Sequence, residues 1–230
     1  LSIVRQVGEA LQYAHANKVV HRALTPRSVW VRPVPGTRGD VKVRVGGWEG
    51  AGILNPADLT RTAVPGVTAL HDADGPAGND TEEGGFGAPE GQWSPTADRA
   101  RIDVFGLGAL AFYVLSSRAP ASGRAELTQR LHTQDGLDLA VELPQVSTEL
   151  RDLVLRATRP APTKRTGDVS TFLALLDAAE RAANRPEESS ADPLEATPGA
   201  LLGGRFELVR RLGQGPPAVG PLVAHKEAPR

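Results

Sequence analysis

The sequence predicts an α+β protein in which a mainly helical unit with one small β-hairpin is followed by a shorter β segment. Helix-spaced apolar residues dominate the first part of the chain, while strand-like runs occur at 29–45 and again from 205 onward. At 184–199, just before the second strand-like run, the composition turns to Pro, Glu, Ser and Ala, which is typical of a linker. We therefore expect a first domain at 1–183, a linker at 184–199 and the start of a second, truncated domain at 200–230.

Helices account for most of the predicted first domain. Residues 1–17 place apolar side chains at spacings of three and four, the stripe of an amphipathic helix. Segment 102–115 is almost continuously apolar and too short to cross a membrane, so it predicts a buried core helix. Further helical patterns occur at 127–131, 149–157 and 169–183.

The predicted β elements are short. Runs at 29–31 and 41–45 flank a turn-rich segment and predict a hairpin, in which we expect Trp30 to belong to the core. Residues 46–87 form a long loop rich in Gly, Pro, Asp and Thr, a type that is usually functional or disordered. After the linker, 205–209 predicts a strand that runs into a glycine-rich segment.

Composition excludes several classes of function. The chain has 26 Lys and Arg against 27 Asp and Glu, a balance that excludes a general polyanion binder, so no nucleic-acid partner is expected. With no Cys, disulfides, a thiol nucleophile and cysteine-ligated zinc are excluded, and the scattered His residues predict no metal site. We expect a cytoplasmic protein with no membrane partner. A chain that starts at Leu1 and contains no Met is expected to be an internal fragment.

The most specific pattern lies between the first helix and the hairpin. Residues 21–28 read His-Arg-Ala-Leu-Thr-Pro-Arg-Ser and are followed by an apolar strand. Later come Ala-Pro-Glu at 88–90, Asp103 near the start of the core helix, and Arg165 after a Pro-Thr-Lys turn. In order and spacing, this set resembles the catalytic loop and later landmarks of serine/threonine protein kinases. The resemblance implies that 1–183 is the carboxy-terminal lobe of a kinase-like fold.

The resemblance implies structural roles for five residues. His21 is expected to pack in the interior, and Arg22 to be available to a phosphorylated activation loop. Asp103 is expected to hold the backbone of the His-Arg turn. Glu90 and Arg165 are expected to form a buried ion pair that serves folding.

Catalysis is not implied, because the functional positions of the family are changed. Ala23, Thr25 and Ser28 stand where the family has its catalytic Asp, Lys and Asn. The D-F-G motif aligns with Val45-Gly46-Gly47, or one residue later, and neither register supplies a carboxylate for magnesium. General-base assistance is worth roughly 10²–10⁴ in rate, and Ala23 can supply none. No intact catalytic residue, metal or cofactor is therefore expected on the first lobe.

The segment after the linker resembles the first strand and glycine-rich loop of another kinase domain. Gly213 and Gly215 match the first two glycines of G-x-G-x-x-G, and Ala218 stands at the third. Pro216 and Pro217 would remove two amide donors from the loop. ATP and magnesium are a family expectation for a complete second domain. Tandem kinase domains, with Asp-Pro-Leu-Glu at 192–195 leading into this strand, resemble the large kinase of the bacterial phage growth limitation (BREX-type) systems.

These features leave three hypotheses for function. In the first, the initial domain is a pseudokinase scaffold or allosteric module for the downstream kinase domain or other protein partners. In the second, the protein is an active ATP-dependent serine/threonine kinase, with non-standard catalytic residues or with activity from the downstream domain. In the third, the chain is a decayed, non-functional product.

Overall fold

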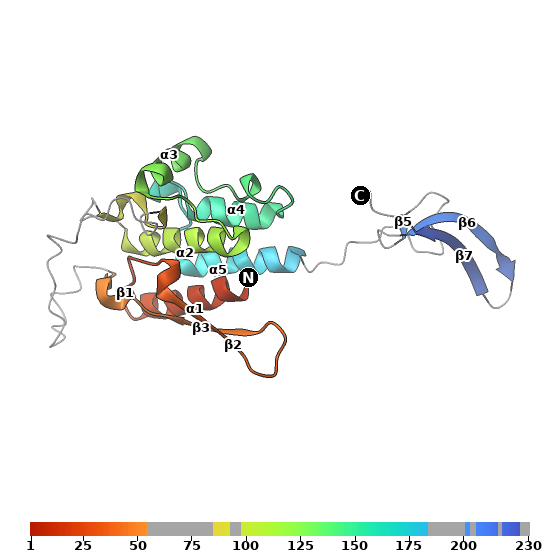
Figure 1. Ribbon diagram of the computed structural model, residues 1–230, viewed down its shortest axis with the longest axis horizontal. Helices are drawn as coiled ribbons and strands as arrows, with labels where there is room; N and C mark the ends of the chain where they lie inside the picture. The colour runs from red at the N-terminus through yellow and green to blue at the C-terminus, as the bar shows by residue number, and fades with distance from the viewer. Residues whose placement is uncertain (55–84, 93–97, 184–200, 203–205, 216–217, 226–230) are drawn as a thin grey trace. The chain divides into compact units, whose positions relative to one another are not determined.

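The computed structural model describes residues 1–54, 85–92, 98–183, 201–202, 206–215 and 218–225 (Figure 1). The chain divides into two compact units, Leu1–Ala183 and Asn184–Arg230. The predicted linker at 184–199, most of the predicted 46–87 loop and Pro216-Pro217 lie outside the described residues. Among the described residues, we find no helix with both the length and the apolar character needed to span a bilayer.

The first unit contains the five predicted helices, which confirms a mainly helical α+β fold. Their bounds are α1 Ser2–Ala16, α2 Arg99–Ser116, α3 Arg124–Gln134, α4 Thr148–Ala157 and α5 Val169–Ala183. Helix α3 extends beyond the predicted range 127–131 at both ends. The prediction was too short because the buried residues of this helix are Leu127 and Leu131, which lie in its middle. Its remaining turns are polar and carry no periodic apolar signal.

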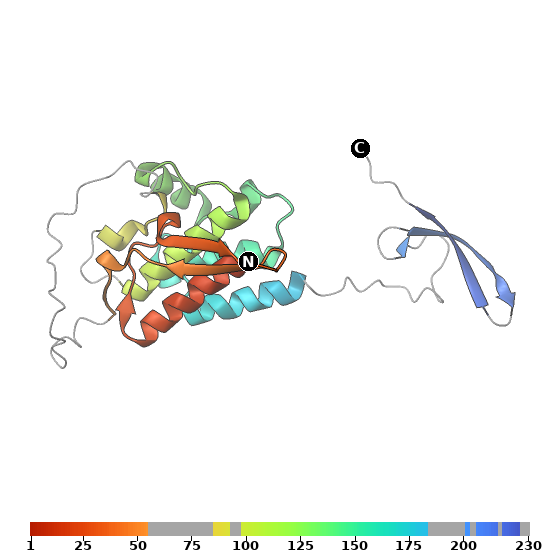
Figure 2. The same ribbon diagram turned by 60° about the horizontal axis from the view of Figure 1, so that its bottom comes forward.

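Helix α2 forms the centre of the first unit. Every residue from 102 to 112 is buried, which explains why this segment lacks a polar face. Helices α1, α4 and α5 pack around it, and α1 and α5 lie side by side (Figure 2). Asp98 caps the start of α2, where its side chain accepts hydrogen bonds from the backbone N–H groups of Ala100 and Arg101. The central helix thereby fixes the positions of the other elements.

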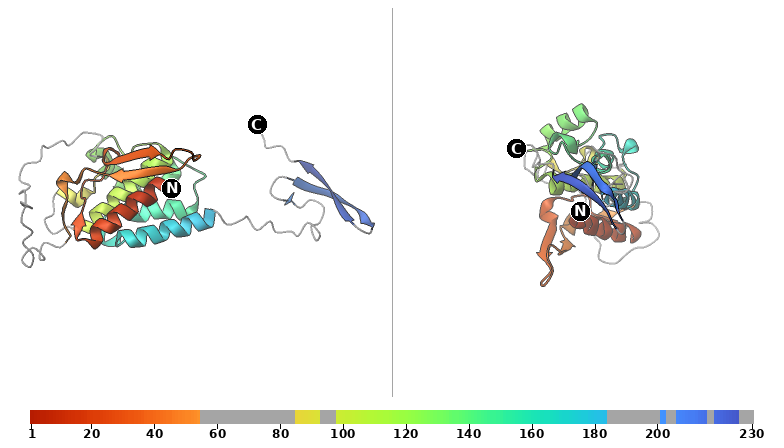
Figure 3. Two further views of the ribbon diagram at one scale, coloured as in Figure 1. Left: turned by 90° about the horizontal axis from the view of Figure 1, so that it is seen from below. Right: turned by 90° about the vertical axis from the view of Figure 1, so that its right-hand side faces the viewer.

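Strands β2 (Val29–Pro33) and β3 (Val41–Val45) form the predicted hairpin on one side of the helices (Figure 3). The side chain of Gln6 in α1 holds the β3 backbone, donating to Val41 O and accepting from Val43 N at 2.9 and 3.0 Å. The expectation that Trp30 belongs to the core is wrong, because this residue is 58% exposed. It lies opposite Arg44, on the face of the hairpin that points away from the core.

A second small sheet was not predicted from the sequence. Strands β1 (Val19–Val20) and β4 (Gly52–Ile53) pair in an antiparallel way and bring together the two ends of the 21–51 segment. Strands of two residues are too short to show an alternating pattern. Their pairing nevertheless closes the chain around the segment that carries the kinase-like residues.

The second unit is a three-stranded antiparallel sheet in the order β5-β6-β7. Its strands are β5 Leu201–Leu202, β6 Phe206–Gly215 and β7 Ala218–His225. The strand predicted from 205 is confirmed and extends through the glycine-rich segment. Strand β7 was missed because Gly220 and Pro221, which are depleted in strands, interrupt its pattern.

Candidate functional site

The kinase-like residues 21–28, here termed the catalytic-loop segment, connect β1 to β2. Asp103 of α2, only 1% exposed, holds the start of this segment. Its carboxylate accepts hydrogen bonds from the backbone N–H groups of His21 and Arg22, at 2.8 and 2.6 Å. A third contact joins its Oδ2 to His15 Nε2 of α1 at 2.7 Å. One buried carboxylate therefore connects α1, α2 and the catalytic-loop segment.

His15 was not singled out as a functional residue by the sequence reasoning. It lies four residues after Leu11, so it continues the buried stripe of α1 for one further turn. A polar residue in that position must find a buried partner, and here the partner is Asp103. The spacing was the signal that could have identified it.

Arg22 adopts an unusual backbone conformation. Its φ of +71° lies in the left-handed region, which residues with a side chain seldom occupy. Such a conformation costs of order 1–3 kcal/mol and persists only where surrounding contacts enforce it. The hydrogen bonds from His21 and Arg22 to Asp103 provide that enforcement.

His21 is fully buried and contacts the segment that follows β3. Its Nε2 lies 2.8 Å from the carbonyl oxygen of Gly46, so this nitrogen carries the proton and donates. The ring lies 4.6 Å from that of Trp48, whose Nε1 donates to Val45 O at 2.9 Å. The His-Arg turn and the position of the D-F-G motif are therefore joined by direct contacts.

The structure brings the four changed positions to one end of the hairpin. Ser28 is buried, with its Oγ 3.4 Å from Ala23 O, and its N–H bonds to Thr25 O at 3.0 Å. Across the hairpin, Val45 pairs with Val29, and Gly46 N donates to Ser28 O at 2.8 Å. The four positions for which the kinase resemblance predicts a changed catalytic centre therefore lie together.

The chemistry available at this end is limited. Asp103 is the buried acid that contacts the catalytic-loop segment, and its two carboxylate oxygens already accept three hydrogen bonds. Glu49 follows in an exposed turn, and Asp40 lies at the opposite end of the hairpin, where its carbonyl accepts from Val34 N. Within 1–54, 85–92 and 98–183, we find no cluster of acidic or His side chains able to hold a metal ion.

Glu90 and Arg165 are in contact. Glu90 lies in the short 3-10 helix Pro89–Gln92, and Arg165 follows the 3-10 helix Pro162–Lys164. Arg165 Nη1 donates to Oε1 at 2.5 Å and Nη2 to Oε2 at 3.2 Å, while its side chain is completely buried. The guanidinium also donates to the carbonyls of Arg159 and Arg101 and lies over the ring of Phe105. All its polar groups are thereby provided with partners.

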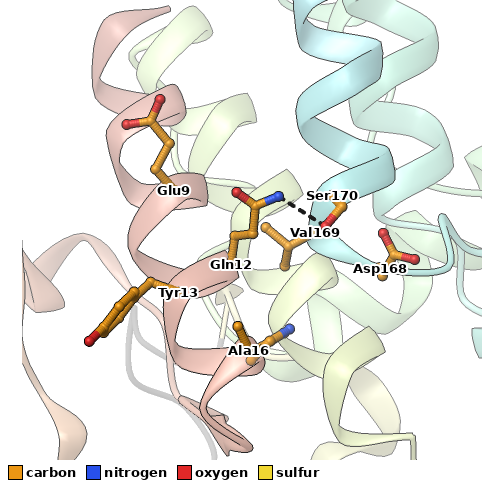
Figure 4. Close-up of a pocket in the computed structure, with 8 residues that line it drawn as sticks. Glu9, Gln12, Tyr13, Ala16, Asp168, Val169 and Ser170 are labelled. Atoms are coloured by element: carbon orange, nitrogen blue, oxygen red, sulfur yellow. Dashed lines mark hydrogen bonds between the residues drawn. The ribbon is translucent and has the colours of Figure 1, made fainter.

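An open groove of about 550 Å³ lies away from the catalytic-loop segment, between α1 and the start of α5 (Figure 4). Gln12 spans it, donating to Ser170 Oγ at 3.0 Å. His15 also lines the groove, and so connects it to Asp103. The residues of the catalytic-loop segment take no part in it.

In the second unit, the glycine-rich residues lie at the closed end of a hairpin. Gly213 and Gly215 end strand β6, Ala218 begins β7, and Gly215 is paired with Ala218. Two paired strands with glycines at their adjoining ends are the context expected for a kinase glycine-rich loop. Binding of phosphate by these residues stays a prediction.

Comparison with known proteins places protein kinases among the relatives of this chain. No family model matches the chain. The curated relatives include serine/threonine-protein kinase PknA of Mycobacterium tuberculosis, 30% identical over 89% of this chain and 42% of the relative. Serine/threonine-protein kinase Pkn1 of Myxococcus xanthus is 28% identical over 78% of this chain and 24% of the relative. The chain belongs to the protein kinase superfamily.

Within that superfamily, the chain is similar along almost its whole length to one large bacterial protein. It is 34% identical over 261 aligned positions to the probable kinase PglW of Streptomyces coelicolor. The alignment covers 99% of this chain and includes both units. It supports the resemblance to the large kinase of the phage growth limitation systems. The chain spans only 16% of PglW and 42% of PknA.

Proposed function

We propose that the first unit is a catalytically inactive kinase lobe that serves as a scaffold or allosteric module for a kinase domain that begins in the second unit. The observation that carries this proposal is the group of Ala23, Thr25, Ser28 and Val45 at one end of the hairpin. None of these side chains can accept a proton as a carboxylate does or bind magnesium strongly. Asp103, the neighbouring buried acid, is already engaged by three donors.

The retained contacts support a folded scaffold over a decayed product. Decay would be expected to release the buried polar groups first, because each depends on a specific partner. In this chain Asp103 keeps its three donors, and Arg165 keeps Glu90 together with the carbonyls around it. These contacts support a folded lobe, and the side chains at the expected catalytic positions support its lack of catalysis.

A second candidate is an active kinase whose phosphate transfer comes from the second unit. Two observations favour it: the hairpin that presents Gly213, Gly215 and Ala218, and the alignment with PglW through this region. In that case the complete second domain would bind ATP and magnesium, and the first unit would still have no catalytic role.

The test is phosphate transfer from radiolabelled magnesium-ATP, with thermal shift, on a protein that contains this chain and a complete second kinase domain. We expect the triple variant Ala23→Gly, Thr25→Ala and Ser28→Ala to transfer phosphate as the parent does. We expect Gly215→Asp to lower any transfer that is present. Transfer that disappears in the triple variant, with an unchanged melting temperature, would overturn the proposed scaffold role.

A further inference from the structure

The outer face of the β2–β3 hairpin carries an unusual concentration of positive charge. We define this hairpin face by its four exposed side chains, which share one side of the ribbon: Trp30, Arg32, Lys42 and Arg44. Segment 29–45 contains four cations and one acid, although the whole chain has a net charge of −1. The other side of the same hairpin is apolar, and its Val29, Val43 and Val45 pack against the core, with β3 in contact with α1.

The cations of this face stand close together without partners. The register places Arg32 directly opposite Lys42 and Trp30 opposite Arg44. Side chains that are directly opposite have their Cβ atoms about 4.5–5.5 Å apart, so like charges there destabilise the hairpin. Among the described residues, the side chains of Arg32, Lys42 and Arg44 form no hydrogen bond or ion pair, and only their backbones pair within the hairpin. The folded protein therefore gains no internal contact from this arrangement.

The aromatic residue of the face is also fixed in place. Trp30 lies against Gly46, where an added Cβ would be 2.1 Å from the indole ring. Glycine at this position lets the large ring approach the backbone closely, while Trp30 stays 58% exposed. A held but exposed tryptophan offers apolar area to a ligand without first losing its own rotamer freedom.

The backbone next to this face is open as well. In the described part of the chain, β2 pairs with β3 alone, so the other edge of β2 has no neighbouring strand. This edge offers the carbonyl groups of Val29, Val31 and Pro33 but only the N–H of Val31, because Val29 N–H donates to Pro26 O and Pro33 has no N–H. Figure 1 shows the hairpin at the margin of the helical unit, with its turn directed away from the helices. An open strand edge binds extended peptides through main-chain hydrogen bonds, and side chains alternate between the two faces of the new strand.

We propose that the β2 edge and the hairpin face bind an acidic, extended segment of a partner protein. Main-chain pairing would add one strand beside β2, and acidic side chains on its outer side would meet the cations of the hairpin face. The same cations repel a second copy of this hairpin, which excludes edge-to-edge self-association and leaves an acidic strand as the complementary partner. The proposal extends beyond the scaffold role, because it would hold for an active kinase too.

A single-stranded nucleic acid is disfavoured by the same observations. Such ligands usually meet several aromatic side chains along a positively charged groove, whereas this face has one tryptophan. The edge of a β-strand also matches the spacing of peptide N–H and C=O groups, which nucleic acids lack. Binding of a single-stranded nucleic acid is the competing hypothesis, and the experiment below tests it directly.

The experiment measures fluorescence anisotropy of a labelled peptide, Glu-Val-Glu-Val-Glu-Val-Glu, with the full chain. The same peptide with Gln in place of Glu and a labelled oligothymidine are the comparison probes. We expect the acidic peptide to bind more tightly than both, and its affinity to fall as salt is raised. We expect Arg32→Glu, which reverses one charge and neutralises Lys42, to weaken binding by about tenfold.

The matched control is Arg181→Glu, an equal charge change on the exposed side of α5, which should alter the affinity by less than about twofold. Arg32→Glu creates an opposite charge across from Lys42, so its urea midpoint should equal or exceed that of the parent. Equal binding of the Gln peptide, unchanged binding in Arg32→Glu, or no binding at all would overturn the proposal. Tighter binding of oligothymidine, lost in Arg32→Glu, would also overturn it and identify nucleic acid as the ligand.

Discussion

Removing the carboxylate of Glu90 is expected to leave Arg165 as a buried, uncompensated cation. The Arg165 side chain has no exposed surface, and the neighbouring carbonyls of Arg159 and Arg101 stay in place but cannot neutralise its charge. Breaking a buried pair from one side typically costs 3–5 kcal/mol. We therefore expect Glu90→Ala to lower the free energy of unfolding by about 3–5 kcal/mol.

The assay is equilibrium urea unfolding of the full chain followed by circular dichroism. The matched control is Asp152→Ala, which removes a carboxylate from an exposed pair with Arg156, where the two side chains are 52% and 56% exposed. An exposed helix pair of this type contributes about 0.3–0.5 kcal/mol. If Glu90→Ala lowers the free energy of unfolding no more than Asp152→Ala does, the assignment of a stabilising buried pair is wrong.

Three further predictions concern stability. Asp103→Asn should lower the free energy of unfolding by about 1–3 kcal/mol for each N–H donor left unsatisfied, as measured by urea unfolding. Gly108→Ala should destabilise by about 1–3 kcal/mol, because the added Cβ would lie 2.7 Å from Ala157 Cβ, whereas Gly167→Ala meets nothing within 4 Å. The hydrogen bond from Arg151 lowers the pKa of Asp138 from its ordinary 3.8, so Asp138→Asn should be less stable than the parent at neutral pH. That difference should disappear as the pH falls below 3.8 and through the lower pKa of the folded state.

Each of these predictions has a result that contradicts it. Unchanged stability of Asp103→Asn would mean that His21 and Arg22 find other acceptors. Equal stability of the two glycine variants would mean that the packing of α2 against α4 does not require a glycine at position 108. A pH-independent difference between Asp138→Asn and the parent would show that the Asp138 charge adds nothing to folding.

The elements that the sequence predicted are those whose signal is long and periodic. Helix α1 buries Val4, Val7, Leu11 and Ala14, the spacing read from the sequence. The β2–β3 hairpin was predicted from alternation, but Trp30 was misplaced because an aromatic residue in a strand is usually buried, and alternation alone does not say which face meets the core. Pairing of β1 with β4 depends on contacts between residues far apart in the sequence, which no local pattern records.

The candidate site was partly predictable for a similar reason. His21, Asp103, Glu90 and Arg165 were found through the order and spacing of kinase landmarks, and the structure supplies the contacts of each. The spacing of His15 on α1 indicates a buried position, but its contact with Asp103 could not be read from the sequence, because it depends on the crossing of α1 with α2. The charged hairpin face was likewise hidden, since cations at 32, 42 and 44 become neighbours only through the register of the strands.

The three hydrogen bonds to Asp103 also have a consequence for motion. The amides of His21 and Arg22 are held by a buried side chain in the second turn of the most buried helix, so they cannot open unless α2 moves. Their exchange with deuterium should therefore follow global unfolding and not the faster local opening typical of loops. A loop that is this closely tied to the core presents a single conformation to any molecule that meets it.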